Sequence, residues 1–248
     1  MPAPITVVIP TLNEGWQIAE CVGQVAWAAE VIVADGGSTD DTVARARAAG
    51  AVVLEVPGVT IAGQRNAAIA RAAHPWVFAL DADERIGPAL AAEVERTIAA
   101  PQHEAYAVWR RNHYLGRPMR FAGWGRNRAV RLFRRERRFV ERRVHEGVEP
   151  VDDVGQLGEA LEHTPYRDLA DQIRKVVLYS EWGARDLADA GRRARVSDVV
   201  LRPAWAFFRS YVLVLGVLEG WRGLVLCGVS AVNVFLKYVR LWDLQRRG

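Results

Sequence analysis

The chain has 248 residues, half of them apolar and a quarter charged, a composition typical of one sizeable α/β domain with an appendage. Its two cysteines, Cys21 and Cys227, lie far apart in the sequence, which excludes a disulfide framework and a cysteine-based metal motif. The first apolar strand begins at Ile5 without a preceding basic segment, so no signal peptide is expected. We therefore expect a protein of the cytoplasm.

The net charge of +4 conceals a strong separation of acidic and basic residues along the chain. Residues 1–109 carry a net charge of −7, whereas residues 110–143 contain 13 arginines and carry +11. A concentrated block of arginines favours an anionic partner, although a solvated basic surface is an alternative interpretation. The block is short and has no motif that reads bases, so we expect no nucleic acid among the partners.

Strands and helices alternate over the first hundred residues. Apolar runs typical of strands buried on both faces occur at residues 5–10, 30–35, 51–56 and 76–80. Helical segments separate these runs and end near residues 28, 49 and 73. This order predicts an α/β fold with a doubly wound, mostly parallel sheet.

Polar side chains follow the predicted strands where these reach the edge of the sheet. Asp35 ends the second strand, and Gly36 and Gly37 let a ligand approach the backbone closely. Asp81 and Asp83 follow the fourth strand, and in an extended chain their carboxylates would share one face about 6–7 Å apart. A cation such as Mg²⁺ or Mn²⁺ fits two such carboxylates and shares its shell with substrate phosphates. Alternatively, these acids only cap the next helix.

Four motifs of this half have the same order and spacing as those of a known enzyme family. They are Val8–Glu14, Val33–Thr42, Gln64–Asn66 and Leu80–Glu84. Together they resemble the family 2 glycosyltransferases of the GT-A fold, a Rossmann-like nucleotide-sugar-binding fold with a mixed, mostly parallel sheet. The chain lacks a Gly-x-Gly-x-x-Gly motif and a P-loop, so a dinucleotide fold and a P-loop fold are excluded.

The resemblance implies a nucleotide-sugar donor, a divalent metal ion and inversion at the transferred sugar. The positions that it assigns to donor binding are Pro10, Thr11, Asn13, Glu14, Asp35, Gly36, Asp40, Gln64, Arg65, Asn66, Asp81 and Ala82. Asp83, together with Asp81, would hold Mg²⁺ or Mn²⁺, which neutralises the departing diphosphate.

The second half resembles a narrower group, the bacterial lipopolysaccharide core glycosyltransferases of the β-1,4-glucosyltransferase type. The motifs that carry this resemblance include Asn112–Arg117, Val130–Arg135, Val144–Glu146 and His163–Leu169. Strands are expected at residues 106–114 and 129–133, with arginine-rich connections. Arginine forks bind phosphate and carboxylate groups, so acceptor-binding roles are predicted for Arg117, Arg128, Arg131 and Arg134.

A general base is needed to activate the acceptor hydroxyl, and Glu146 is the predicted base. The alternative is a structural histidine at His145 and a salt-bridged glutamate beside the arginines. The other histidines, at positions 74, 103, 113 and 163, show no metal-ligand spacing, so zinc is not expected.

The C-terminal residues differ in composition from the rest. Residues 168–190 form a helix whose apolar positions suit packing, and residues 199–248 carry a net charge of +5. The apolar runs 211–218 and 224–236 are shorter than the roughly 20 residues of a spanning helix. Interleaved tryptophans and arginines favour helices in the interface of an anionic membrane. A buried hairpin, a dimer face and a re-entrant pair are the alternatives.

These observations predict a GT-A domain at residues 1–198 and a membrane-interface helical extension at 199–248. Within the domain, residues 1–100 form the donor half, 101–167 the acceptor half and 168–198 a packing helix. The expected function is metal-dependent, inverting hexosyl transfer from UDP-glucose or a similar donor to a lipid-linked or lipopolysaccharide core saccharide. The protein would act peripherally at the inner face of the cell membrane.

Three other functions compete with this expectation. A polyprenyl-phosphate glycosyltransferase would use the arginines to hold the lipid phosphate, and a membrane-associated assembly protein would have no catalytic activity. A sugar-nucleotide pyrophosphorylase would need a glycine-rich triphosphate loop near its first strand, and Pro10–Glu14 is not such a loop.

Overall fold

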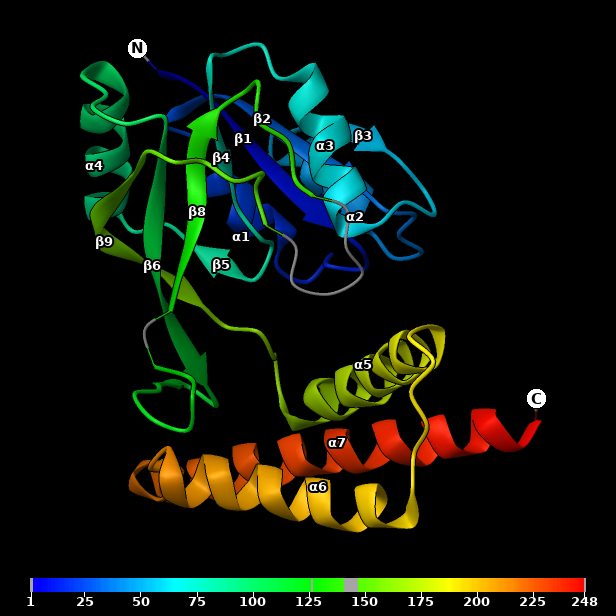
Figure 1. Cartoon of the computed structure of the whole chain (residues 1–248). Helices are drawn as coiled ribbons and strands as arrows, with labels where there is room; N and C mark the ends of the chain where they lie inside the picture. The colour runs from blue at the N-terminus through cyan, green and yellow to red at the C-terminus, as the bar shows by residue number, and fades with distance from the viewer. Residues whose placement is uncertain (1, 126, 141–146, 248) are drawn as a thin grey trace. The chain divides into compact units, whose positions relative to one another are not determined.

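The computed structural model of the chain describes residues 2–125, 127–140 and 147–247, which form two compact units (Figure 1). Unit 1 comprises residues 1–111 and 127–163, and unit 2 comprises residues 112–126 and 164–248. The expected boundary after residue 198 therefore differs from the observed division. The reason is that the helix preceding that boundary packs against the last helix of the chain.

Unit 1 is built on a mixed sheet. Its strands are β1 (Ala3–Thr11), β2 (Ala28–Asp35), β3 (Val52–Glu55), β4 (Trp76–Ala79), β5 (Glu84–Arg85), β6 (Ala105–Tyr114), β8 (Asn127–Arg134) and β9 (Val154–His163). Among the described residues the strand order is β3-β2-β1-β4-β8-β6-β9-β5. The first four strands are parallel, as predicted, and β8 and β6 continue the sheet in antiparallel orientation. The end of β6 lies in unit 2, where it pairs with β7 (Arg117–Pro118).

Four helices cover this sheet: α1 (Ile18–Gly23), α2 (Thr42–Ala48), α3 (Ile61–Arg71) and α4 (Pro88–Ala99). The side chain of Thr60 caps α3 by accepting a hydrogen bond from the Gly63 N–H (3.1 Å), and Pro88 stands in the first turn of α4. Helix α1 ends five residues before the predicted end, because Ala28 already pairs with Ala3 in the sheet.

Consecutive residues of β1 pack on opposite faces of the sheet, as the pleat of a strand requires. Val7 belongs to the core beneath α1, α2 and α4, which also buries Cys21, and Val8 belongs to the core beneath α3. Both valines are fully buried, and each such side chain contributes about 1.5–3 kcal/mol. This confirms the α/β sheet predicted from uninterrupted apolar runs.

Unit 2 is mainly helical. Its helices are α5 (Leu169–Asp189), α6 (Val196–Phe208) and α7 (Trp221–Arg247); a π-helical turn (Arg209–Leu213) and a 3₁₀ turn (Gly216–Glu219) join the last two. Both α5 and α6 pack against α7 (Figure 1). Helix α7 extends beyond the predicted apolar run at both ends, and its segment Trp221–Arg246 is long and apolar enough to cross a membrane. The expectation that this region is too short to span was therefore wrong.

Candidate functional site

The carboxyl ends of β1 and β2 meet at one edge of the unit 1 sheet. Thr11 pairs with Asp35 in the parallel ladder, and its hydroxyl donates to the Asp35 carboxylate (3.3 Å). The same carboxylate accepts hydrogen bonds from the N–H groups of Gly37 (3.0 Å) and Ser38 (2.8 Å) and from the Ser38 hydroxyl. Asp35 is 2% exposed, and its carboxylate holds the turn of residues 36–38 at this edge of the sheet.

The loops after β1 and β2 are tied to each other by side-chain hydrogen bonds. Asn13, whose backbone is left-handed (φ 58°), accepts from the Thr39 N–H (2.8 Å). Asp40 accepts from the Gly15 N–H (3.2 Å) and from the Thr42 N–H (3.0 Å). Burial would raise the pKa of Asp40, but these hydrogen bonds outweigh it and hold the pKa below its ordinary value. The structure therefore brings the first two predicted motifs together.

The start of α3 lies beside the turn at Gly36. Gln64 is buried and its amide lies so close to Gly36 that a Cβ on Gly36 would be 2.5 Å from Nε2. A side chain at Gly36 would therefore require the Gln64 amide to move. Asn66 has another role: its amide donates to the Phe139 carbonyl (2.9 Å) and accepts from the Phe139 N–H (2.8 Å). The nitrogen and the oxygen of this amide both bind the Phe139 backbone. The predicted contact of Asn66 with the nucleotide-sugar donor therefore does not fit this geometry.

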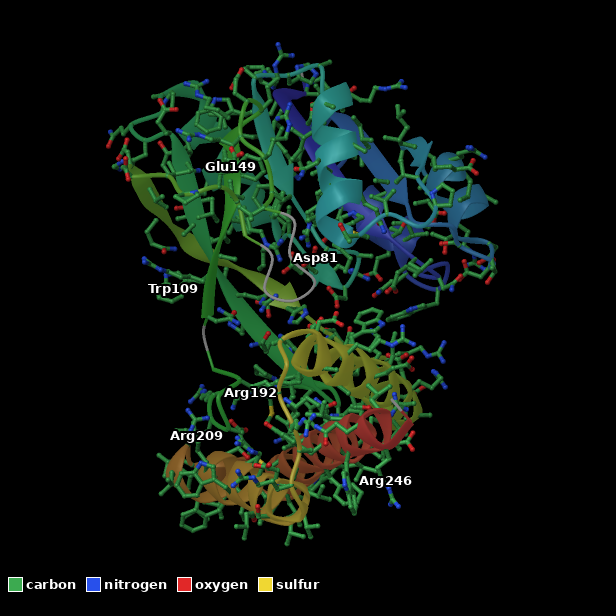
Figure 2. All side chains as sticks on the ribbon, turned by 45° about the vertical axis from the view of Figure 1, so that its right-hand side comes forward. Asp81, Trp109, Glu149, Arg192, Arg209 and Arg246 are labelled. Carbon is green, nitrogen blue, oxygen red and sulfur yellow. The ribbon has the colours of Figure 1, made fainter. Side chains whose placement is uncertain are left out.

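Asp81 lies just beyond the carboxyl end of β4 (Figure 2) and is held by two guanidinium groups. Its Oδ1 pairs with Arg65 Nη2 (2.5 Å) and its Oδ2 with Arg131 Nη2 (2.7 Å). Arg131 also pairs with Glu84 Oε1 (2.5 Å), and Arg110 lies 3.5 Å from the same oxygen. Glu84 is fully buried, so these residues form an internal ion-pair cluster at the end of the sheet.

The two carboxylates of this cluster are perturbed in opposite directions. Burial raises the pKa of Asp81, but the charges of Arg131 and Arg65 outweigh it and hold the pKa far below its ordinary value. Burial raises the pKa of Glu84, and the partly opposing charge of Arg131 does not reverse this shift. Burial and the charge of Arg131 thus act on both carboxylates, which makes this arginine the centre of the cluster.

Asp83 points to a different partner from Asp81. The expected extended chain is absent here, because the Glu84 N–H donates to the Asp81 carbonyl (2.9 Å) and turns the backbone. One Asp83 carboxylate oxygen lies 3.4 Å from His163 Nε2. Both carboxylate oxygens of Asp81 are paired with arginine, whereas Asp83 lies beside an imidazole, so the two carboxylates have different partners in this structure.

The pair of Asp83 and His163 has the chemistry of a metal site. A carboxylate oxygen and an imidazole nitrogen are ligands that Mn²⁺ accepts, and Mg²⁺ accepts the carboxylate. Within the described ranges no group of three or more His, Cys, Asp and Glu side chains gathers as a metal cage, so phosphates or water would complete the shell. The spacing of the histidines did not point to His163, which the β5–β9 ladder places opposite Glu84.

The predicted acceptor residues are not gathered at one place in unit 1. Arg128 is exposed on β8, but Arg131 is buried in the ion-pair cluster and does not fit a direct acceptor contact. Arg134 pairs with Trp76 at the amino end of β4, and its guanidinium lies 4.1 Å from the centre of that ring. Arg134 therefore lies at the amino ends of the parallel strands, opposite the carboxyl ends where Asp81 lies. Arg117 lies in unit 2 and is exposed, and the predicted base, Glu146, lies outside the described residues, as does His145.

The chain resembles known glycosyltransferases over most of its length. It is 29% identical to the lipopolysaccharide core biosynthesis glycosyltransferase LpsC of Rhizobium meliloti, a match covering 95% of this chain and 93% of that protein. It is also 29% identical to an uncharacterized glycosyltransferase of Rickettsia felis, covering 96% of this chain and 89% of the other.

A solved structure with partial similarity is glucosyl-3-phosphoglycerate synthase from Mycobacterium tuberculosis, with 25% identity and a TM-score of 0.39. The match covers 44% of each chain. Residues 6–148 match the profile of the family described as Glycosyl transferase family 2. This match extends over more than half of the sequence and includes all four motifs at the sheet edge. The chain therefore belongs to glycosyl transferase family 2 and is a glycosyltransferase of the GT-A fold.

Proposed function

We propose that this glycosyltransferase moves a hexose, with inversion, from a UDP-sugar such as UDP-glucose to a saccharide of the lipopolysaccharide core. The relative in Rhizobium meliloti is named for lipopolysaccharide core biosynthesis, and the match spans nearly all of both chains. The acceptor is attached to lipid, so the enzyme would act peripherally at the inner, cytoplasmic face of the cell membrane.

The observation that carries the proposal is the convergence of the strand ends in unit 1. The β1 and β2 loops meet through Asp40 and Gly15, and the β4 end brings Asp83 to the same edge of the parallel sheet. In an open α/β sheet, ligands bind beyond the carboxyl ends of the strands. The donor nucleotide would lie along the loops, with Thr11, Glu14 and the turn of Asp35 around it.

Asp83 and His163 are the residues that would hold a divalent metal ion. When bound, Mn²⁺ or Mg²⁺ would neutralise the charge that develops on the departing diphosphate. The protein would hold the ion through one carboxylate and one imidazole and leave its other positions to phosphate oxygens. Asp81 would act indirectly, because Arg65 and Arg131 fix its carboxylate and the turn that presents Asp83.

The acceptor hydroxyl requires a base, and we assign this role to Glu146. A carboxylate in a closed cleft can remove the hydroxyl proton as the bond to the anomeric carbon forms. Arg117 and Arg128 are exposed and remain the proposed contacts for acidic groups of the acceptor.

A donor panel tests the proposal directly. The purified protein is incubated with UDP-glucose, UDP-galactose, UDP-N-acetylglucosamine or ADP-heptose, with Mn²⁺ and defined core saccharides. Transfer from a UDP-hexose to a core acceptor is the expected result. Transfer from ADP-heptose alone would contradict the donor assignment.

A polyprenyl-phosphate acceptor is the second candidate. Helix α7 favours it to some extent, because its length and composition suit a membrane-embedded substrate. Thin-layer separation of the products with both acceptors distinguishes the two functions. Slow UDP-sugar hydrolysis with Mn²⁺ would exclude a non-catalytic assembly role.

A further inference from the structure

Helix α7 is apolar, and few of its residues are fully buried. Its most apolar window of 18 residues has a mean hydropathy of 1.6, and 17% of that window is buried among the described residues. The core helix of a soluble protein would have most of such a surface buried. An apolar surface of this extent requires another covering, either lipid or protein.

Five of the exposed large apolar side chains of α7 form one stripe, and Leu244 (41% exposed) lies outside it. The five are Trp221 (56% exposed), Leu224 (49%), Val232 (49%), Phe235 (43%) and Trp242 (37%). With 3.6 residues per turn, these five positions fall within a sector of roughly 80° around the helix axis. The stripe extends for about 32 Å along the helix, since each residue rises about 1.5 Å.

The side of α7 that packs against α5 combines apolar and polar contacts, and Leu241 shares a buried apolar cluster with Ala184 of α5. Arg240 Nη1 donates to the Val177 carbonyl (2.9 Å) and pairs with Glu181 (3.3 Å). Helix α5 also carries Arg174 and Arg185, whose side chains are 60% and 64% exposed. If α7 crossed a bilayer, these charges would enter the hydrocarbon with it, at high cost. An exposed apolar stripe on a helix whose neighbour carries exposed charges fits a position in the membrane plane instead.

The connection between α6 and α7 extends the apolar surface. Leu213 (55% exposed), Leu215 (46%) and Leu218 (61%) project from residues 209–220. Leu215 has a left-handed backbone (φ 57°), an unfavourable conformation for a leucine, and yet its side chain is not buried. The one acidic residue of this segment, Glu219, turns inward and accepts two backbone N–H groups of unit 2 (2.6 and 2.8 Å). The tip therefore presents leucines and no carboxylate.

Basic residues accompany this surface. Arg209 and Arg246 lie toward opposite ends of the α6–α7 pair (Figure 2), and residues 199–248 contain seven basic and two acidic side chains. Arg246 lies 5.8 Å from the ring centre of Trp242, a pairing suited to the headgroup region. We propose that the exposed apolar stripe of α7 and the 209–220 tip dock unit 2 onto an anionic lipid bilayer, with α7 lying in the membrane plane. This inference rests on the membrane-bound acceptor of the proposed function.

Vesicle sedimentation of the full chain tests the docking. We expect binding to vesicles of phosphatidylcholine with about 30% phosphatidylglycerol, and weaker binding to phosphatidylcholine alone. Leu218→Glu and Val232→Glu should each weaken binding at least about 10-fold, because each replaces an inserted side chain by a charge. Val52→Glu is the matched control, because Val52 is 60% exposed but lies on β3 of unit 1, and its binding should be unchanged.

Spin labels measure the orientation of α7. Leu224→Cys and Trp242→Cys are labelled separately; the native Cys21 and Cys227 are buried and should not react. We expect both labels at the same shallow depth. A spanning helix would place them about 27 Å apart in depth, given 18 residues at about 1.5 Å each, and that result would overturn the in-plane orientation.

Two controls separate this inference from the proposed function. UDP binding, measured in the same samples, should be unchanged in Leu218→Glu and Val232→Glu, because the candidate donor site lies in unit 1. Vesicle binding without any sugar transfer would refute the proposed function and leave the docking intact. Two results together would overturn the docking: the full chain does not bind vesicles, and it forms a dimer that Val232→Glu dissociates. The stripe would then be the contact surface for a second copy of the chain.

Discussion

Replacing Arg131 by Met removes the central cation of the ion-pair cluster while keeping a long side chain. The substitution leaves Glu84 fully buried, with Arg110 3.5 Å away, and leaves Asp81 paired with Arg65 among the described residues. Removing one partner from a buried ion pair costs about 3–5 kcal/mol, because it leaves an uncompensated charge. Since Arg65 and Arg110 remain, we expect the lower end of this range, about 3 kcal/mol. For a chain of this size, this corresponds to a fall in Tm of roughly 6–12 °C.

The loss should depend on pH in a defined direction. In the wild-type protein the folded pKa of Asp81 is lowered, so its contribution to stability is present above its unfolded pKa and is lost as the pH falls. Without Arg131 the folded pKa of Glu84, already raised, rises further. A carboxyl group with a raised folded pKa stabilises the fold in acid and loses that contribution as the pH rises. The difference in stability between the wild type and Arg131→Met should therefore be larger at about pH 8 than at about pH 5.

Thermal and urea unfolding followed by circular dichroism measure both effects. Arg128→Met is the matched control, since Arg128 is exposed on the same strand, and its unfolding free energy should change by less than about 0.5 kcal/mol. Arg131→Lys should recover part of the stability, because an ammonium keeps the charge but cannot bridge two carboxylates as a fork does. A variant Arg131→Met that melts within about 2 °C of the wild type at both pH values would refute the cluster as a source of stability.

The remaining predictions concern the reaction. Asp83→Asn should lower turnover at least about 100-fold with an unchanged Tm, and near-wild-type turnover would end its assignment to the metal. His163→Ala should raise the Mn²⁺ concentration needed for half-maximal activity at least about 10-fold, and an unchanged Mn²⁺ dependence would remove His163 from the site. Glu146→Gln should keep UDP binding and reduce sugar transfer roughly 100-fold. If Glu146→Gln transfers sugar at the full rate and His145→Ala transfers none, the base is misassigned.

The parallel half of the fold could be predicted from the sequence, because its strands are buried on both faces. Val7 and Val8 pack into different cores, and this arrangement leaves an uninterrupted apolar run that is easy to recognise. Strand β9 gave no such signal, since Gln156, Gly158 and Glu159 are exposed along it. Its pairing with β5 is a long-range contact that no local pattern encodes. That pairing is what brings His163 near Asp83.

The four motifs lie within the part of the chain that matches the family, but the contacts of individual side chains depended on tertiary structure. Asn66 stands within a motif typical of donor binding, yet its amide holds the backbone of Phe139, which is 73 residues away in the sequence. Arg131 belongs to an arginine block that suggested an anionic partner, and its anions proved to be Asp81 and Glu84 of the same chain. Composition indicates that a charge needs a partner, but it does not distinguish an internal partner from a ligand.

Asp81 and Asp83 have different partners because of the turn that separates them. Because the Glu84 N–H donates to the Asp81 carbonyl, the two carboxylates do not share a face, and each meets a different partner. Asp81 and Glu84 carry two negative charges when ionised, against the three guanidinium groups of Arg65, Arg110 and Arg131. With Asp83 counted, three carboxylates stand beside three guanidinium groups, so the formal charges balance. A divalent cation held at Asp83 would therefore supply the positive charge that an anionic diphosphate requires at this edge of the sheet.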